Sequence, residues 1–414
     1  MEAAASERVV VLDNGAHSLK CGLSHHEHPV CLPNASAKSR AENFTRYGES
    51  LKEVKDVTGL VLRRPFDRGF LSNVELEKDI WSSVFNKTLG IDPRETGLLL
   101  TEPMLNLDSC QNLMEQVVFE EFGFQSYYSC PAPLLAARYQ CATMGDLDAS
   151  KAGCCLVLDL GYSFSHAVPV FDNRVVNYGV KRLDFGGKAA TNLLKEVVSY
   201  RSMNVMNESY IVELLKEDAC YVSQDADADL RSAQKERKGA NSVEYVLPDG
   251  MNVFRPHLKT REEDDKKKSQ QQNQSFVNPR HAPQIVTMSH ERFMVPEVHF
   301  NPSDVGINQA GIAELLIQAC ESVDPVLHPL LLSNVLVMGG SSLFPGLLER
   351  LQTELRKVSP IDCKVNVWHT KQAQTCAWYG GKLLVSSGEY RSKAVTRQEF
   401  SEHGCDPLVR RFCS

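Results

Sequence analysis

Two kinds of hydrophobic pattern alternate along the chain. Runs rich in Val, Leu and Ile have the length of buried strands and occupy residues 9–12, 155–158, 167–171 and 334–338. Longer stretches have helical periodicity and cover residues 111–122, 187–200, 209–222 and 346–357. In the last stretch Leu347, Leu351 and Leu355 recur every four residues with polar residues between them, which predicts a helix that packs one face on a sheet. The alternation predicts an α/β fold.

One pattern occurs twice. Residues 10–18 and residues 156–164 each read as a buried strand that ends in Asp-x-Gly and continues into a turn. The two copies begin 146 residues apart. We therefore expect two similar lobes, each of which presents one turn to a common cleft.

The Asp-x-Gly turns suit phosphate binding. Glycine lets the backbone approach an anion closely, and successive N–H groups of such a turn point at one site. Asp13 and Asp159, at the ends of the two strands, could orient the water shell of a Mg²⁺ ion, which keeps several waters and takes few protein ligands. Each Asp could instead only cap its own turn, but the occurrence of a pair favours the metal.

A third glycine turn runs from an apolar strand into a predicted helix. Gly339-Gly340 would let a flat ring or a phosphate lie close to the backbone. Ser341 or Ser342 could cap the helix that follows. A Gly-Gly pair by itself is most often only a turn.

Composition narrows the function classes. The chain of 414 residues is 43% hydrophobic and 23% charged, which is typical of a globular protein. Its net charge of −7 argues against broad electrostatic binding of nucleic acid. Thirteen cysteines without a CxxC pair indicate a reducing compartment. With no 18-residue apolar stretch and no secretory signal pattern, we expect a protein of the cytosol or the nucleus.

Residues 251–289 differ from their surroundings. The charged run 261–268 precedes the polar run 269–274, with almost no apolar periodicity. We expect a mobile surface loop here. Lys266, Lys267 and Lys268 could form a nuclear-import signal or a weak phosphate contact, although a solvated charge run is the favoured interpretation.

The order of the glycine turns resembles that of the actin, Hsp70 and sugar-kinase superfamily, and the local sequences resemble actin. Segments with close actin counterparts follow in the same order over nearly the whole chain: 98–106, 114–122, 182–184, 216–222, 244–250 and 378–381. The resemblance implies an actin-like two-lobed, duplicated fold with a central nucleotide cleft. Residues 1–150 and 375–414 would form the first lobe, with 33–64 as its small subdomain. Residues 151–374 would form the second lobe, with 186–307 as its small subdomain.

The resemblance also implies a site for ATP or ADP with Mg²⁺. The phosphates and the metal would be surrounded by Asp13, Asn14, Gly15, Lys20, Asp159, Gly161 and His166, with the two aspartates holding the metal through water. The nucleoside would be lined by Gly187, Lys216, Glu217, Gly339, Gly340, Ser341 and Phe344. His166 could instead be a hydrogen-bonded core histidine, but its place beside the turn favours the cleft.

The departures from actin gather where the γ-phosphate would lie. Pro131 stands where actin has the glutamine that places the attacking water. Ala16 and His17 replace a serine and a glycine of the first turn, Tyr162 replaces an aspartate of the second, and Gln374 replaces a lysine near the adenine. Phosphoryl transfer depends on positioning and charge stabilisation. We therefore expect nucleotide binding without enzymatic hydrolysis. His17 could either block or contact the γ-phosphate, and the expectation is the same in both cases.

Filament formation is also unexpected. The segment 33–64 is shorter than the polymer-contact loop of actin and lacks its hydrophobic tip. The segment 251–289 replaces a connection of only a few residues, so it would obstruct or remodel packing along a filament.

Among actin-related proteins, the motifs 161–166, 199–206 and 220–225 resemble the sixth class. That resemblance implies a protein of the nucleus, with some in the cytoplasm, that acts as a scaffold in a Swr/SRCAP-type chromatin remodeller. The implied partners are the motor ATPase subunit, a small zinc-knuckle subunit and, through the complex, a nucleosome. The implied process is exchange of a core histone for its Z-type variant, with no membrane and no homopolymer. The alternative is a filament-forming cytoskeletal ATPase. A small-molecule kinase would need an acceptor site that no segment offers.

Three short motifs have a simpler structural explanation than a functional one. The segment 24–29 holds His25, His26 and His28 without the spacing of a catalytic zinc site, so we expect an exposed turn. Cys154-Cys155 lies in an apolar run and should be core packing. Gly380-Gly381 should permit close packing against residues 132–142.

Overall fold

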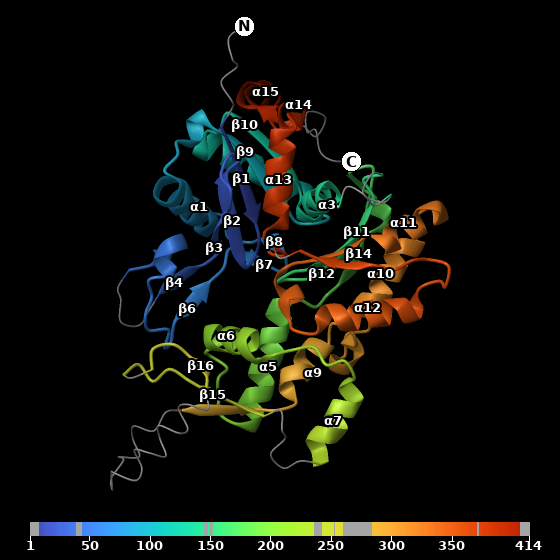
Figure 1. The fold of residues 1–414 in the computed structure, drawn as a ribbon. Coiled ribbons are helices and arrows are strands. Elements are labelled where there is room, and N and C mark those ends of the chain that lie inside the picture. The colour runs from blue at the N-terminus through green and yellow to red at the C-terminus, as the bar shows by residue number, and fades with distance from the viewer. Residues whose placement is uncertain are drawn as a thin grey trace.

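Two mixed β-sheets with one common arrangement form the centre of the molecule (Figure 1). Each contains a hairpin beside two parallel strands: β1 and β2 beside β9 and β10, β11 and β12 beside β18 and β19. The computed structural model describes residues 8–38, 44–144, 148, 152–235, 242–251, 253–259, 284–370 and 372–405. The predicted α/β class is confirmed, and the repeated Asp-x-Gly segments form equivalent hairpins in the two sheets.

The first sheet has the strand order β20-β10-β9-β1-β2-β3. Its strands are β1 (Val9–Asn14), β2 (Ser18–Leu23), β3 (Val30–Pro33), β9 (Gly97–Glu102), β10 (Ser126–Pro131) and β20 (Val395–Thr396). All six residues of β1 are buried, as its apolar run predicts for a central strand. Antiparallel pairing of β1 with β2 sets Asp13 opposite Lys20.

The second sheet has the order β13-β12-β11-β18-β19, with β14 paired to β12. Its strands are β11 (Cys155–Leu160), β12 (Ser165–Phe171), β13 (Arg174–Val175), β14 (Lys181–Leu183), β18 (Val335–Met338) and β19 (Val367–His369). Its hairpin sets Asp159 opposite His166, and parallel pairing sets Asp159 beside Met338. The second and third glycine turns therefore leave the same edge of this sheet.

Smaller sheets extend both lobes (Figure 1). In the first lobe they are formed by β4 (Ser36–Lys38), β5 (Arg46–Tyr47) and β6 (Val61–Arg63), and by β7 (Phe66–Asp67) with β8 (Phe70–Leu71). In the second lobe β15 (Val243–Val246) lies between β16 (His257–Leu258) and β17 (Ile285–Met288).

The strand β17 corrects the expected loop 251–289. Residues 285–288 pair with β15, and residues 257–258 pair with its other edge. The alternation of Ile285, Val286, Thr287 and Met288 places Val286 and Met288 in the core, a signal that the charged residues before it obscured. Lys266, Lys267 and Lys268 lie outside the described residues.

Helices surround the sheets. Those of the first lobe and its C-terminal part are α1 (Val74–Ser83), α2 (Asp108–Gln116), α3 (Ala132–Thr143), α13 (Cys376–Ser386), α14 (Glu389–Lys393) and α15 (Arg397–His403). Those of the second lobe are α5 (Gly187–Arg201), α6 (Ser209–Ala219), α7 (Ala226–Lys235), α9 (Glu291–Glu297), α10 (Ile312–Glu321), α11 (His328–Ser333) and α12 (Leu347–Val358).

The predicted helices are present, with one shortened. The stretch 111–122 is helical throughout, since a π-helical turn, Val117–Phe122, continues α2. The expected helix 209–222 ends at Ala219. There the chain leaves the helix to pair elsewhere: the Tyr221 N–H donates to the Arg292 carbonyl at 3.0 Å and the Val222 N–H to the Pro345 carbonyl at 2.8 Å.

The helices α3 and α13 join the two sheets. They lie side by side between them (Figure 1), and one buried cluster includes Val11 of the first sheet and Val157 of the second. The Trp378 indole of α13 donates to the Val11 carbonyl at 3.1 Å. A Cβ on Gly380 would lie 1.8 Å from the Leu135 carbonyl oxygen, so only glycine permits this approach and the predicted close packing is confirmed.

Gly380→Ala should therefore destabilise the protein by about 3 kcal/mol or more, because the two helices must separate. Ser386→Ala, at an exposed position of the same helix, should change stability by less than about 0.5 kcal/mol. Denaturant unfolding of both variants checks this. Equal stability of the two would show that the contact between α3 and α13 is not tight.

Candidate functional site

A cavity of about 590 Å³ lies where the three glycine turns meet. Its walls come from both sheets and from α6. Every residue that the sequence predicted for the nucleotide site lines it: Asp13, Asn14, Gly15, Lys20, Asp159, Gly161, His166, Gly187, Lys216, Glu217, Gly339, Gly340, Ser341 and Phe344. Residues more than 300 positions apart thus face one space.

The first turn is held from below by β9. The Thr101 hydroxyl donates to Asp13 Oδ1 at 2.8 Å and accepts from the Asn14 N–H at 2.8 Å. Lys20 Nζ lies 3.1 Å from Asp13 Oδ2. A Cβ on Gly15 would lie 2.8 Å from the Ser18 carbonyl oxygen, so glycine is needed for this tight turn. These contacts fix Asp13, Asn14, Gly15 and Lys20, all of which line the cavity.

The second turn carries the partner aspartate. Burial, and then the negative charge of Asp13, raise the pKa of Asp159 to about 7. Burial also lowers the pKa of His166, which faces Asp159 across the hairpin, to about 4. The Gly187 N–H donates to the Gly161 carbonyl at 3.0 Å, which ties this turn to the start of α5.

Asp13 and Asp159 come from opposite lobes and act on each other electrostatically. Burial, and then the charge of Asp13, disfavour the ionised form of Asp159; a Mg²⁺ ion would offset both effects, and oxygen donors are the ligands it prefers. These two carboxylates fit a water-shelled Mg²⁺, whose charge would be shared with a bound polyphosphate. Lys20 supplies a fixed positive charge on the same side.

The third turn and α6 form the deeper wall. Gly339 has φ +93°, and a Cβ there would lie 2.4 Å from the Leu160 carbonyl oxygen, so this position requires glycine. Lys216 Nζ donates to the Gly187 carbonyl at 3.0 Å and to Thr191 Oγ1 at 2.9 Å. Burial lowers the pKa of Lys216. Its amine is thus fixed beside the first turn of α5.

The predicted capping role of the serines after this turn is wrong. The N-cap of α12 is Gly346, and no side chain caps that helix. The Ser342 hydroxyl instead donates to the Gly339 carbonyl at 2.6 Å, because Gly340–Leu343 forms a separate 3₁₀ turn. Ser341 lines the cavity, near Gly187.

A cluster of four side chains crosses the cleft beside the phosphate turns. His17 Nε2 lies 2.9 Å from Glu213 Oε1, and Arg64 Nη2 lies 3.1 Å from Glu213 Oε2. Arg64 also donates to the His17 carbonyl at 2.7 Å and lies over the Tyr162 ring at 4.8 Å. His17 and Arg64 belong to the first lobe, whereas Tyr162 and Glu213 belong to the second. His17 and Tyr162 are recognisable in the sequence as departures from actin, whereas no local motif marks Arg64 or Glu213.

His17, Glu213 and Glu217 also form the one cluster of three possible metal ligands among the described residues. Arg64 already pairs with Glu213, so this cluster is explained by an ion pair. The tract with His25, His26 and His28 forms no such cluster; His28 Nδ1 instead lies 2.7 Å from the Tyr379 hydroxyl.

The start of α3 offers the cavity no polar side chain. Pro131 ends β10 and is the N-cap residue of α3, and Ala132 and Pro133 line the cavity next to it. None of these three side chains can donate or accept a hydrogen bond. This wall therefore cannot orient a water through a side chain.

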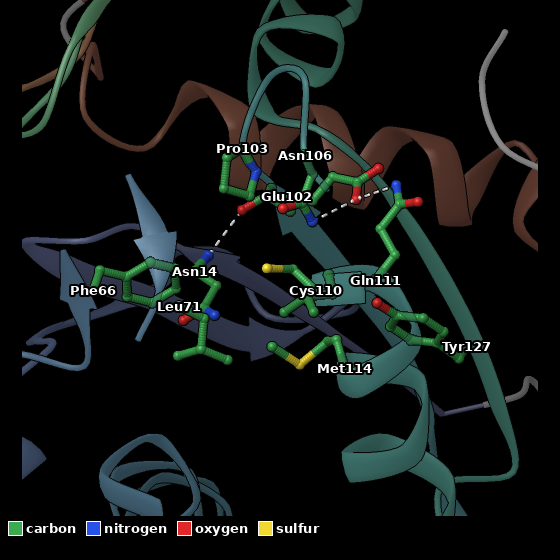
Figure 2. A pocket seen from close by; sticks show the side chains of 12 residues that line it. Asn14, Phe66, Leu71, Glu102, Pro103, Asn106, Cys110, Gln111, Met114 and Tyr127 are labelled. Carbon is green, nitrogen blue, oxygen red and sulfur yellow. Dashed lines mark hydrogen bonds between the residues drawn. The ribbon is translucent and has the colours of Figure 1, made fainter. Parts of the chain in front are cut away.

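A second, much smaller cavity of about 30 Å³ lies behind the first turn (Figure 2). Asn106 and Gln111 donate to Glu102 Oε2 there at 3.2 and 2.9 Å. Its volume suits a water molecule and is far below that of a nucleotide site. The cavity is lined in part by Thr101, whose hydroxyl holds the first turn.

Glu213 should contribute measurably to stability. Burial alone would raise the pKa of Glu213, but hydrogen bonding to His17 and the charges of His17, Arg64 and Lys216 hold it at about 2. Because the folded-state pKa is depressed, this stability is present above the unfolded pKa and is lost as pH falls from about 4.5 toward 2. Glu213→Gln should therefore lose about 2 to 3 kcal/mol at pH 7.

Chemical denaturation at pH 7 and pH 3 measures this, with Glu314→Gln at an exposed position of α10 as the control. The difference between Glu213→Gln and the parent should shrink at the lower pH. A difference that does not change with pH would contradict the ion-pair origin.

None of the helices in the described residues is long and apolar enough to cross a membrane.

Comparison with known proteins agrees with this geometry. The family model for actin matches residues 4–414. Actin-related protein 6 of Arabidopsis thaliana is 39% identical, with 98% of this chain and 99% of that protein covered. The proteins of the same name from Oryza sativa subsp. japonica (38% identical; 98% and 98% covered) and Drosophila melanogaster (36%; 97% and 99%) are similarly related. The chain therefore belongs to the actin family and, within it, to the actin-related proteins of the type called actin-related protein 6.

Proposed function

We propose that this protein binds ATP or ADP with Mg²⁺ in the central cavity as a structural ligand, without enzymatic hydrolysis. The observation that carries the proposal is the meeting of three glycine turns, two carboxylates and Lys20 on one cavity. Its volume of about 590 Å³ lies within the range of small-molecule sites. The backbone N–H groups and Lys20 would face the phosphates, and Asp13 and Asp159 would hold Mg²⁺ through water.

Hydrolysis of the γ-phosphate would lack a side chain that positions the attacking water. The wall at Ala132 and Pro133, which follow Pro131, has no side chain to aim a water. Bound nucleotide would instead join the two lobes and stabilise the folded state by mass action.

Saturating nucleotide should raise the melting temperature. At a free concentration one hundred times the dissociation constant, the gain in stability is about 2.7 kcal/mol. Chelating Mg²⁺, or the Asp159→Asn substitution, should remove most of that gain, whereas Asp227→Asn on exposed α7 should retain it. Phosphate release by the purified protein should stay near background. Release at the rate of polymerising actin assayed in parallel would refute the non-enzymatic role.

We further propose that the protein is a non-filamentous scaffold subunit of a nuclear chromatin-remodelling complex that exchanges a core histone for its Z-type variant. The support is the similarity to the actin-related protein 6 group, together with the motifs 161–166, 199–206 and 220–225. The proposed partners are the motor ATPase subunit and a small zinc-knuckle subunit, with nucleosome contact through the complex. The alternative is a filament-forming cytoskeletal ATPase.

Two experiments separate these roles. Tagged protein purified from nuclei should bring down remodeller subunits, identified by mass spectrometry, and a tag on the same chain in cytosolic extract should bring down few. In a pelleting assay at micromolar concentration with Mg²⁺ and ATP, the protein should stay in the supernatant. Pelleting together with absence of remodeller subunits would favour the cytoskeletal role.

A further inference from the structure

A fully buried carboxyl group lies behind the first phosphate turn. Glu77, on the inner face of α1, is 1% exposed. Neither of its side-chain oxygens has a hydrogen-bond partner among the described residues. The groups that face it are the side chains of Asn14, Asn34 and Trp81, none of them charged. A buried carboxylate without a cation is costly, so this position calls for an explanation.

Asn34 connects Glu77 to the turn. The Asn34 N–H donates to the His17 carbonyl at 2.9 Å. Its side-chain amide donates to the Gly15 carbonyl at 3.1 Å and to Asn14 Oδ1 at 3.4 Å. One fully buried residue thus contacts three residues of the turn that would receive the phosphates, two of them through its side chain and one through its backbone.

Two further buried atoms beside Glu77 also lack partners: Asn34 Oδ1, an acceptor, and Trp81 Nε1, a donor. A protonated carboxyl group offers one O–H donor and one carbonyl acceptor. It could donate to Asn34 Oδ1 and accept from Trp81 Nε1. A carboxylate can only accept, and would leave Asn34 Oδ1 unsatisfied.

We propose that Glu77 is a positioning residue of the nucleotide site: its protonated carboxyl group holds Asn34, and through it Asn14 and Gly15, in the conformation that receives the phosphates. The inference rests on the proposed nucleotide binding. Ionisation of Glu77 would break the contact with Asn34 and place a negative charge behind an anion site. The affinity for nucleotide should therefore fall as Glu77 loses its proton.

The surrounding charges agree with this assignment. Burial raises the pKa of Glu77 to about 7, although the polar side chains of Asn14, Asn34 and Trp81 that face it oppose the rise. The nearby ionisable groups have partners of their own: Asp13 pairs with Lys20 at 3.1 Å, and Asp79 of α1 accepts from the Tyr47 hydroxyl at 3.2 Å.

On the solvent side of α1, Glu75 pairs with Lys78 at 3.0 Å, and Lys78 also reaches Glu121 of the neighbouring π-helical turn at 3.2 Å. No cation is thus placed to keep Glu77 ionised among the described residues that act on it.

Glu77→Gln tests the proposal, because it keeps the shape and removes the titration. The matched control is Glu75→Gln, which removes the same charge from the exposed face of the same helix. The affinity for a fluorescent ATP analogue with Mg²⁺ is measured from pH 6 to pH 8.5. Over this range the parent and Glu75→Gln should lose up to roughly thirty-fold more affinity than Glu77→Gln. Asp159 and the ligand titrate equally in all three proteins, so only the difference between profiles is read.

Superimposable profiles for Glu77→Gln and the parent would overturn the proposal. Asn34→Ala provides a second variant, which should flatten the profile in the same way because it cuts the connection to the turn. A retained parental profile in Asn34→Ala would also count against it.

Thermal melting without nucleotide separates this inference from the proposed function. Because the folded-state pKa of Glu77 is raised, the parent loses stability as pH rises from the unfolded value toward 7. Glu77→Gln should therefore melt higher than the parent at pH 8.5, with a much smaller difference at pH 5. If this difference appears but the parent binds no nucleotide at any pH, nucleotide binding is refuted, and the positioning role with it. If the difference is absent, Glu77 is not protonated as proposed.

Discussion

The structure depends on bringing two carboxylates from different lobes to one place. Asp13 and Asp159 lie at the ends of the central strands of two similar sheets, and the helices α3 and α13 join those sheets. Burial, and then the charge of Asp13, raise the pKa of Asp159 to about 7, so two ionised carboxylates at this place carry an electrostatic cost. A cation with a polyphosphate would remove that cost, which links occupancy of the cavity to the relative position of the lobes.

Ion pairs supply a second connection across the same cleft. Glu213 receives both His17 and Arg64, and its low pKa shows that these contacts outweigh the cost of burial. Close packing at Gly380 joins α3 to α13, whereas these ion pairs lie beside the cavity. The lobes are therefore connected both through the packed helices and through ion pairs across the cleft.

Much of this arrangement could be predicted from the sequence. The repeated Asp-x-Gly pattern is local, and it predicted the two hairpins. The residues that the resemblance to actin placed on the three turns and on α6 all line one cavity. Arg64, Glu213, Asn34 and Glu77 were missed, because their significance arises only when distant elements meet. The strand β17 was missed since a charged run masked its short alternation, and Gly346 rather than a serine caps α12 because a 3₁₀ turn intervenes.

The first turn is held by residues that similarity to actin in the turn itself does not reveal. His17 replaces a glycine of actin, and its side chain pairs with Glu213 while its carbonyl accepts from Arg64 and Asn34. The turn is thereby held through its carbonyl groups as well as through the bond from the Asn14 N–H to Thr101. Asn34 in turn depends on the protonation of a buried acid behind it. In the proposed nucleotide site, the geometry that would receive the phosphates is thus set by residues behind the turn rather than by the turn alone.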